Sequence, residues 1–329
     1  MTAGERSAKA RVAIDLGGSS VKIGVLDQDG SVLLRDEFVV TGEPADLDRA
    51  ADLAGQLIKE SGVPVDGAGV ALPGVVDRAA GQLIRAHDKY GYLGDRDLRA
   101  WGATALGVPT MIENDARAAL LGEVTYGCAR GATDAVIMTL GTGIGTAALI
   151  DGTLLRGRHD HAGILGGHQT VDLSGIPCNC GNLGCSEAEA STWSLPLHLA
   201  RHPQRDASAL ARIERPGLAV LFAAAEDDAA AADLRTRFLT VWGAALVSLC
   251  HAYDPEVVIV SGGVLRARDR VLPPLTDYVH EHLWSSAHRP ELITPDRPED
   301  SVLRGLAALA AAQTATESNP VPPTAARKR

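Results

Sequence analysis

Three cysteines and a histidine stand close together in the sequence, at a spacing that suits a metal ion. Cys178, Cys180 and Cys185 fall within eight residues, and His168 precedes Cys178 by ten residues. Two glycines among the cysteines allow the backbone to wrap around an ion. Three thiolates and one imidazole form a closed tetrahedral set, which is typical of a structural zinc site. We therefore predict a zinc ion on these four side chains, with unmetallated thiols or a redox pair as the alternatives.

A second group of polar side chains follows a short apolar segment and opens an alanine-rich one. Glu113, Asn114 and Asp115 come directly after the expected strand 109–112. Open α/β sheets bind ligands at the carboxyl ends of their strands. A carboxylate in that place can accept the proton of a hydroxyl group that attacks phosphorus. The alternative is an ordinary helix N-cap followed by an acidic first turn.

Two glycine-rich turns are candidates for binding an anion, Gly17-Gly18-Ser19-Ser20 and Gly141-Thr142-Gly143. Because these turns carry little side chain, their backbone N–H groups can approach a phosphate closely. Asp15, just before the first turn, could hold a metal ion through water, and Lys22 could pair with phosphate or with a carboxylate. Neither turn ends in the Gly-Lys-Ser/Thr of a Walker phosphate loop.

A third glycine segment, Ser261-Gly262-Gly263-Val264, lies between an expected strand and an expected helix. Backbone amides at the N-terminus of a helix suit the ribose or the phosphates of a nucleotide. A short strand-to-helix turn also needs a glycine for purely structural reasons, so this segment alone does not decide between the two roles.

These residues need strands and helices to position them, and the hydrophobic spacing indicates which. Short apolar runs around glycines predict a hairpin over 12–26, and a third strand follows over 31–40. Apolar residues at helical spacing predict a helix over 45–61. Strands and helices continue to alternate, which indicates the α/β class. The other expected elements are strands 65–72, 109–112 and 257–260 and helices 98–106, 115–126, 229–253 and 302–312.

An internal repeat relates the two halves of the chain. Asp15-Leu16-Gly17 and Thr139-Leu140-Gly141 begin matching segments 124 residues apart, and Leu26-Asp27 falls on Ile150-Asp151 at the same offset. Each half is therefore expected to open with a strand, a tight glycine turn, a strand, an Asp/Gly turn and a third strand. Two similar lobes facing each other would leave a cleft between them.

Composition and charge exclude several classes of protein. The 329 residues exceed the ~250 to 300 that one hydrophobic core usually supports, so two domains are expected. A formal net charge of -10 argues against nonspecific binding to nucleic acid or membrane. The most apolar stretch, 136–150, is interrupted by glycines and is too short to span a bilayer. The N-terminus shows no secretory signal, and we expect a cytoplasmic protein.

Taken together, the motifs resemble those of the ROK sugar kinases, a family within the actin-like ATPase superfamily of ribonuclease-H-like folds. The resemblance covers about residues 12–312 and implies a two-lobed α/β fold with an interlobe cleft. The motifs that carry it are Asp15-Leu16-Gly17-Gly18-Ser19-Ser20-Val21-Lys22, Leu72-Pro73-Gly74-Val75-Val76-Asp77, Glu113-Asn114-Asp115, Thr139-Leu140-Gly141-Thr142-Gly143-Ile144-Gly145, and His168 with 178–187.

The resemblance implies transfer of the γ-phosphoryl group of ATP to a sugar hydroxyl, usually the 6-hydroxyl of a hexose. It makes Asp115 the general base and places Asp15 near Mg²⁺, and it lets His168 bind zinc while helping to position the sugar. The sugar contacts that it implies are Gly74, Asp88, Asn114, His168 and Glu187. The nucleotide and phosphate contacts that it implies are Asp15, Gly17, Gly18, Ser19, Lys22, Thr142, Gly143, Gly262 and Gly263. It also implies a homodimer.

Two positions depart from the family pattern. Leu165 stands where the family usually has a glutamate that contacts the sugar, and the loss of such a charge-assisted hydrogen bond costs about 1.5 to 3 kcal/mol. Asp88 stands where an asparagine is usual, which suggests an acceptor that carries a positive amine. The alternatives to a hexose kinase are a sugar-binding regulator and a catalytically weak paralogue. Only about 11 residues precede the first strand, too few for a helix-turn-helix, and the negative charge also opposes DNA binding.

The domain boundaries follow from the same reasoning. We expect an N-terminal lobe over 1–117 on the sugar and phosphate side, completed by a C-terminal helix over 301–313. The C-terminal lobe, with the zinc site and the nucleotide contacts, is expected over 118–300. The remaining residues, 314–329, are polar and contain prolines, and we predict a disordered tail there.

Overall fold

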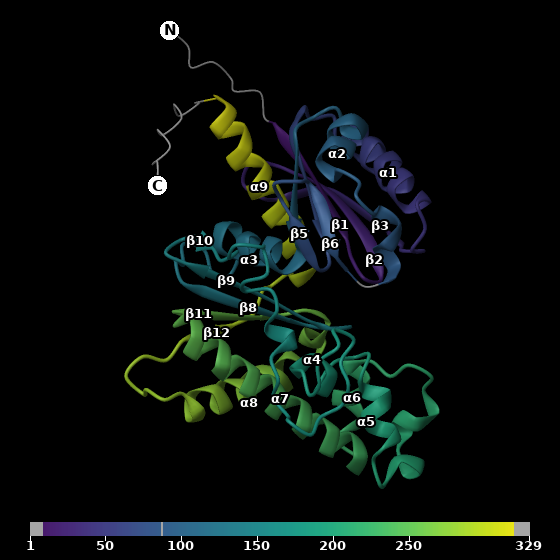
Figure 1. Ribbon diagram of the computed structural model, residues 1–329, viewed down its shortest axis with the longest axis vertical. Helices are drawn as coiled ribbons and strands as arrows, with labels where there is room; N and C mark the ends of the chain where they lie inside the picture. The colour runs from purple at the N-terminus through teal and green to yellow at the C-terminus, as the bar shows by residue number, and fades with distance from the viewer. Residues whose placement is uncertain (1–8, 87, 319–329) are drawn as a thin grey trace. The chain divides into compact units, whose positions relative to one another are not determined.

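The chain folds into two compact units (Figure 1), each built around a five-stranded sheet. The structure is a computed structural model that describes residues 9–86 and 88–318, with only the backbone described for Asp88 and for 314–318. Unit 1 comprises Met1–Gly122 and Val302–Arg329, and unit 2 comprises Glu123–Ser301. The division falls inside helix α3 (Asp115–Tyr126), a few residues after the predicted boundary at 117.

Unit 1 contains a mixed sheet in the order β3-β2-β1-β4-β7, in which β1, β4 and β7 are parallel and β2 and β3 are antiparallel to their neighbours. A small hairpin, a short 3-10 helix and four helices complete it. The strands are β1 (Ala10–Leu16), β2 (Ser20–Leu26), β3 (Val32–Val39), β4 (Val65–Leu72), β5 (Val75–Asp77), β6 (Gln82–Arg85) and β7 (Thr110–Asn114). The helices are α1 (Ala45–Ser61), η1 (Asp88–Leu93), α2 (Leu98–Leu106), the start of α3, and α9 (Ser301–Ser318).

Helices α1 and α2 cover one face of this sheet (Figure 1). Successive residues of a strand point to opposite faces, and Val12, Ile14 and Leu16 of β1 all pack in the core with Leu47 and Leu57 of α1. The intervening residue Asp15 is therefore directed to the opposite face of the sheet, at the carboxyl end of the strand.

The opposite face of the unit 1 sheet is lined with small residues, and α9 packs closely against it. Ala13 and Ala71 lie in one core cluster with Leu303 and Leu306 of α9. A Cβ atom at Gly69 of β4 would come within 2.8 Å of the Leu306 side chain, so the strand needs glycine there. Helix α9 therefore packs directly on this face of the unit 1 sheet.

A pair of glycine substitutions tests how tightly the helices of unit 1 pack. A Cβ atom at Gly305 of α9 would overlap the carbonyl group of Ala118 in α3, whereas Gly55 of α1 faces open space. We expect Gly305→Ala to lower the free energy of unfolding by about 1–3 kcal/mol through overpacking. The matched control Gly55→Ala should raise it by about 0.5–1 kcal/mol, because alanine is the better helix former. Urea denaturation measures both, and equal stability of the two variants would contradict the close approach of α3 and α9.

Unit 2 repeats the sheet of unit 1, in the order β10-β9-β8-β11-β12. Its strands are β8 (Ala135–Leu140), β9 (Ile144–Ile150), β10 (Thr153–Leu154), β11 (Val257–Ser261) and β12 (Glu291–Ile293). Its α-helices, beside the end of α3, are α4 (Ser186–Glu189), α5 (Leu195–Ala200), α6 (Leu218–Ala224), α7 (Ala229–Tyr253) and α8 (Arg268–His282). Its 3-10 helices are η2 (Gly166–His168), η3 (Arg205–Ala207), η4 (Ala209–Arg212), η5 (Gly263–Ala267) and η6 (Pro298–Asp300).

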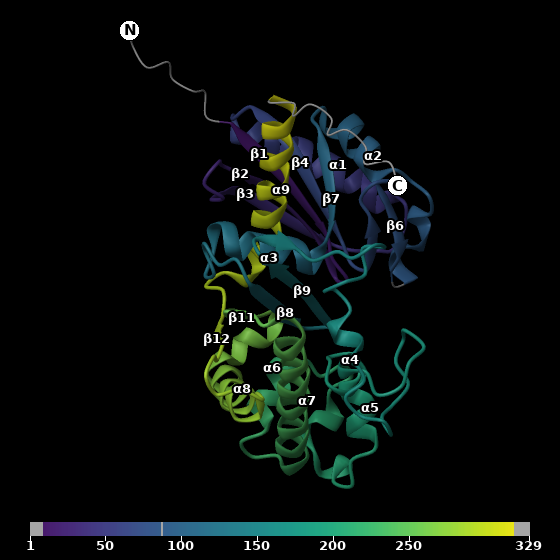
Figure 2. The ribbon, with the colours of Figure 1, turned by 60° about the vertical axis from the view of Figure 1, so that its left-hand side comes forward.

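The core of unit 2 forms between its sheet and the helices α6, α7 and α8, which lie together on one side of the sheet in Figure 2. Helix α7 brings Phe238 and Trp242 into this core, and the Trp242 ring stacks on Phe222 of α6 with the ring centroids 6.0 Å apart. The Trp242 indole donates a hydrogen bond of 2.7 Å to the carbonyl oxygen of Ala190. Phe222, Phe238 and Trp242 thus pack the long helix against the rest of the core.

The two sheets confirm the internal repeat and correct its register. Arg11 of β1 pairs with Leu26 of β2, and the matching Ala135 of β8 pairs with Leu149 of β9. The turn after β8 is therefore one residue shorter than the turn after β1, and Leu26 corresponds to Leu149 rather than to Ile150. A constant offset of 124 residues holds only as far as the glycine turns.

The C-terminal helix is longer than the sequence indicates. Helix α9 continues to Ser318, whereas the tail was expected to begin at 314, because the alanine-rich segment propagates the helix beyond its packed part. The rest of the predicted tail, 319–329, lies outside the described residues. None of the helices within the described part of the chain is both long enough and apolar enough to span a bilayer.

Candidate functional site

In unit 1 the candidate base lies at the junction between strand β7 and helix α3. Asn114 ends the strand, and its Oδ1 accepts a hydrogen bond of 3.0 Å from the backbone N–H of Arg117, as an N-cap does. Its Nδ2 donates to Asp115 Oδ1 at 2.9 Å and to the carbonyl oxygen of Gly74 at 3.0 Å. One asparagine thus caps the helix, orients the Asp115 carboxylate and joins both to the Gly74 segment.

Two carboxylates of this site have raised pKa values. Burial raises the pKa of Asp115 to about 7, and the negative charge of Asp15 adds to the rise, although the Asp115 side chain is only half-buried. Burial likewise raises the pKa of Asp15 to about 6, against the opposing effect of Lys22, whose Nζ lies 3.8 Å from Asp15 Oδ2. A carboxylate with a pKa near 7 can both take up and release a proton at neutral pH, as a general base must.

The first glycine turn closes tightly between β1 and β2. The N–H of Gly17 donates to the carbonyl oxygen of Ser20 at 3.1 Å, and a Cβ atom at Gly17 would lie 2.8 Å from that same oxygen. Gly18 faces open space, with nothing within 4 Å of its missing Cβ atom. Asp15, Gly17, Gly18, Ser19 and Lys22 are thus brought to one end of the β1-β2 hairpin, as the sequence predicts.

The second glycine turn, in unit 2, is held by a buried glutamate. Glu187 Oε2 accepts a hydrogen bond of 2.9 Å from the N–H of Ile144, and Glu187 Oε1 accepts one of 3.2 Å from the indole N–H of Trp193. The backbone N–H of Trp193 also donates to the Thr142 carbonyl oxygen at 3.2 Å. A Cβ atom at Gly143 would come within 2.5 Å of the Glu187 carboxylate, so glycine is required in this turn.

The third glycine segment lies beside the second. Gly262 follows β11 with a φ of 97°, a conformation that favours glycine. A Cβ atom there would come within 2.5 Å of the carbonyl oxygen of Leu140, which directly precedes Gly141. The two segments predicted to bind nucleotide, 141–143 and 262–263, are therefore neighbours at the carboxyl ends of adjacent parallel strands, β8 and β11.

The four predicted zinc ligands converge in unit 2. The ligand atoms of His168, Cys178, Cys180 and Cys185 all lie within 4.8 Å of one another. Cys178 Sγ lies 3.6 Å from His168 Nδ1, and Cys180 Sγ lies 3.6 Å from Cys185 Sγ. With zinc–ligand bonds of about 2.0–2.3 Å, tetrahedral ligands stand about 3.3–3.8 Å apart, so the group fits zinc. Nδ1 is the ring nitrogen of His168 that lies beside the Cys178 thiol.

The surroundings of the cluster also suit a cation. Burial raises the pKa of the Cys178 and Cys185 thiols, that of Cys185 to about 12, so these thiols need a nearby positive charge to ionise. The Asn182 amide donates to Cys185 Sγ at 3.4 Å, a hydrogen bond that favours the thiolate. His168 is the last residue of the short 3-10 helix η2. Its position therefore depends on the loop that contains η2 and not on a strand or a long helix.

Comparison with known protein families matches residues 11–313 to the ROK family. The chain belongs to the ROK family. The glucokinase of Thermotoga maritima is 31% identical over 308 residues, which cover 91% of this chain and 96% of that protein. The solved structure of the ROK hexokinase from Thermus thermophilus superposes with a TM-score of 0.77 at 29% identity, covering 93% of this chain and 99% of that one.

A further solved structure, a ROK family glucokinase from Streptomyces griseus in complex with glucose and AMPPNP, has a TM-score of 0.74 at 27% identity, covering 92% of this chain and 99% of that one. These ROK structures and the paired five-stranded sheets confirm the predicted α/β fold of actin-like ATPase type. The interlobe cleft, the homodimer and the cytoplasmic location stay predictions.

One predicted site residue of this ROK protein has no described side chain, and one residue that contacts the site was not predicted. The side chain of Asp88 is outside the described residues, and Leu165 is 40% exposed at the start of η2. No local sequence pattern marks Trp193, which donates a hydrogen bond to Glu187, because the two residues meet only through the fold of α4 and the turn that follows it.

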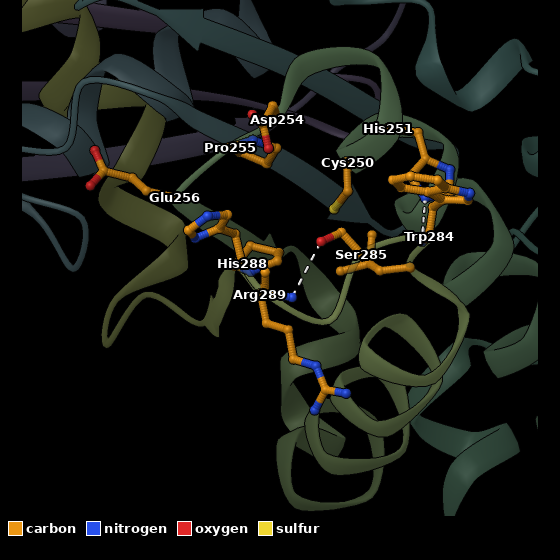
Figure 3. A pocket seen from close by; sticks show the side chains of 12 residues that line it. Cys250, His251, Asp254, Pro255, Glu256, Trp284, Ser285, His288 and Arg289 are labelled. Carbon is orange, nitrogen blue, oxygen red and sulfur yellow. Dashed lines mark hydrogen bonds between the residues drawn. The ribbon is translucent and has the colours of Figure 1, made fainter.

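A hollow of about 590 Å³ in unit 2 is separate from all of these residues (Figure 3). It lies beside the amino end of β11, between 254–256 and 283–290, whereas Gly262 follows the carboxyl end of the same strand. Trp284 is 92% exposed at its edge, and its backbone N–H donates to His251 Nε2 at 3.1 Å. The predicted ligand residues of the ROK protein are not among those that line this hollow.

Proposed function

We propose that this ROK protein transfers the γ-phosphoryl group of ATP to a hydroxyl group of a glucose-like hexose, with Asp115 as the general base. The observation that carries the proposal is the Asp115 carboxylate, which Asn114 orients and whose pKa lies at about 7. The relatives named glucokinase and ROK hexokinase support the reaction class.

In the proposed reaction the acceptor hydroxyl gives its proton to Asp115 as its oxygen attacks the γ-phosphorus. The bond between the γ-phosphorus and the bridging oxygen breaks, and ADP leaves with that oxygen. Asn114 keeps the base in place, and its Oδ1, which accepts one hydrogen bond from the N–H of Arg117, has a further lone pair for a sugar hydroxyl. Gly74, whose carbonyl oxygen already binds Asn114, forms the adjoining part of the sugar site.

Asp15 is the proposed residue for Mg²⁺, held through water. Its carboxylate is buried, and Lys22 Nζ at 3.8 Å is too far for a hydrogen bond, so the carboxylate oxygens can accept hydrogen bonds from water molecules bound to the ion. The ion, when bound, would neutralise the phosphate charge that repels the incoming oxygen. The amides of Gly18 and Ser19 would bind phosphate oxygens beside it, and Gly17, whose N–H donates to the Ser20 carbonyl oxygen, would let the phosphate approach the turn closely.

In unit 2 we propose that Thr142 and Gly143 contact the phosphates and that Gly262 and Gly263 contact the adenosine. Their adjacency at the ends of β8 and β11 supports this assignment, because a nucleotide spans several such amides at once. Glu187 already accepts two hydrogen bonds, yet each carboxylate oxygen has a further lone pair for a sugar hydroxyl.

His168 is the proposed link between the zinc ion and the sugar. Its Nδ1 would bind the ion and its Nε2 would contact a sugar hydroxyl, so the zinc fixes the orientation of the imidazole. We also propose that the zinc ion is structural, since four protein ligands leave no position for a substrate.

The acceptor is tested by a panel of sugars. We propose that Asp88, a carboxylate where the family usually has an amide, favours a hexose with a protonated amine. The values of kcat/KM for glucose, glucosamine, mannose, N-acetylmannosamine and fructose should then be highest for glucosamine. A clear preference for glucose would reject the amino-sugar assignment but not the kinase, whereas the absence of phosphoryl transfer to every sugar would reject the kinase itself.

A further inference from the structure

The 3-10 helix η1 places two donors on the carbonyl oxygens of the first glycine turn. Lys89 Nζ donates to the carbonyl oxygen of Gly18 at 2.9 Å, and the Tyr90 hydroxyl donates to that of Gly17 at 2.7 Å. These contacts join segments that are 71 and 73 residues apart in the sequence. The turn is therefore supported from outside the hairpin that contains it.

This support determines where the amides of the turn point. In a trans peptide the C=O of one residue and the N–H of the next are directed oppositely. With the Gly17 and Gly18 carbonyl groups directed to η1, the N–H groups of Gly18 and Ser19 point away from it. Neither N–H donates a hydrogen bond to any described residue, so both are available to an anion.

The two donors on η1 differ in character. Tyr90 is 2% exposed, and burial, more than the nearby carboxylates Asp15 and Asp115, raises the pKa of its hydroxyl above the usual range, so it remains a donor. Lys89 is exposed, and an ammonium group has three N–H donors, of which the Gly18 carbonyl takes one. Within the described residues Lys89 has no carboxylate partner, whereas Lys22 is paired with Asp15.

A phosphate brought to this turn carries negative charge toward the Asp15 and Asp115 carboxylates. The free amides of Gly18 and Ser19 supply two partial positive charges that oppose this repulsion, provided that both face the phosphate. Lys89 and Tyr90 keep them in that direction, because each holds the carbonyl group of the same peptide unit on the opposite side.

We propose that Lys89 and Tyr90 are both positioning residues, which direct the amides of Ser19 and Gly18 at a phosphate of ATP. This inference rests on the proposed function, because it assumes that the turn binds ATP. It extends the phosphate site of unit 1 from the β1-β2 hairpin to η1.

The test compares Lys89→Met with Lys59→Met, a control that removes an exposed lysine from the last turn of α1. We expect Lys89→Met to lower kcat/KM for ATP by about 10- to 100-fold, because the Ser19 amide is then no longer held toward the phosphate and one charge-assisted hydrogen bond is lost, with KM for the sugar unchanged. Lys89→Arg should recover most of the loss. Calorimetric binding of ATP without sugar should weaken by about tenfold in Lys89→Met only.

Two results would overturn the inference. One is a Lys89→Met protein that binds and uses ATP like Lys59→Met, and the other is a loss confined to KM for the sugar, which would place Lys89 on the acceptor. Melting temperatures show whether each variant is folded. Because ATP binding is measured without turnover, the inference is still tested if the wild type phosphorylates no hexose, a result that would reject the proposed function separately.

Discussion

Replacing Asp115 by alanine is expected to lower kcat by about 10²- to 10⁴-fold, because the acceptor hydroxyl then loses the group that takes its proton. Asp115→Asn is the sharper variant. The amide oxygen can still accept the hydrogen bonds that Asp115 Oδ1 receives from the N–H of Ala116 and from Asn114, so the start of α3 is preserved. Both variants should be nearly inactive, and a rate above about a tenth of the wild type in either would reject Asp115 as the base.

The pH dependence of kcat/KM is a second test of Asp115 as the general base. A base with a pKa of about 7 is active when deprotonated, so kcat/KM of the wild type should fall as the pH drops below 7. The residual activity of Asp115→Asn should lack this limb. A wild-type profile that stays flat between pH 6 and 8 would contradict the assignment.

The melting temperature shows whether the Asp115 variants are folded. Because the pKa of Asp115 is raised, the folded protein binds more protons than the unfolded chain between about pH 4 and 7, and this group makes stability fall as the pH rises through that range. Asp115→Asn removes the ionisable group. The variant should therefore melt at a higher temperature than the wild type at pH 8 and at a similar temperature near pH 4.

Removal of the zinc site is expected to have the second largest effect. Cys185→Ser should reduce the zinc content from about one ion per chain to nearly none and lower the melting temperature by more than about 10 °C, since a structural ion contributes several kcal/mol. Within the loop the Cys178 N–H donates to the Asn182 carbonyl at 2.8 Å and the Gly181 N–H to the Cys178 carbonyl at 2.9 Å, and the ion would tie these turns to His168.

Cys128→Ser is the matched control, because Cys128 is an exposed cysteine outside the ligand group. Its zinc content and melting temperature should equal those of the wild type. A strong chelator should reproduce the effect of Cys185→Ser on the wild type and leave the variant unchanged. A metal-free wild type that melts at the same temperature as the metal-containing form would contradict the structural role of zinc.

The sequence allowed prediction of the features that depend on neighbouring residues. The strands of the β1-β2 hairpin, the helix over 45–61 and the convergence of His168 with the three cysteines all follow from local spacing, and the structure contains each of them. The internal repeat predicted the second sheet for the same reason, since similar local patterns form similar hairpins.

Features that depend on distant residues were missed or misplaced. The one-residue difference between the two glycine turns appears only when strand pairing fixes Leu26 opposite Arg11 and Leu149 opposite Ala135. The support of the first turn by Lys89 joins segments far apart in the chain, and no local pattern marks it. Such contacts are decided by the packing of whole elements, which spacing along one segment does not determine.

Phosphoryl transfer with Asp115 as the base is tested by incubating the protein with γ-labelled ATP and the preferred hexose and following the label. We expect label in a sugar phosphate, formed in a one-to-one ratio with ADP by the wild type and nearly absent with Asp115→Asn. Label released only as inorganic phosphate, or sugar phosphate formed equally well by Asp115→Asn, would contradict it.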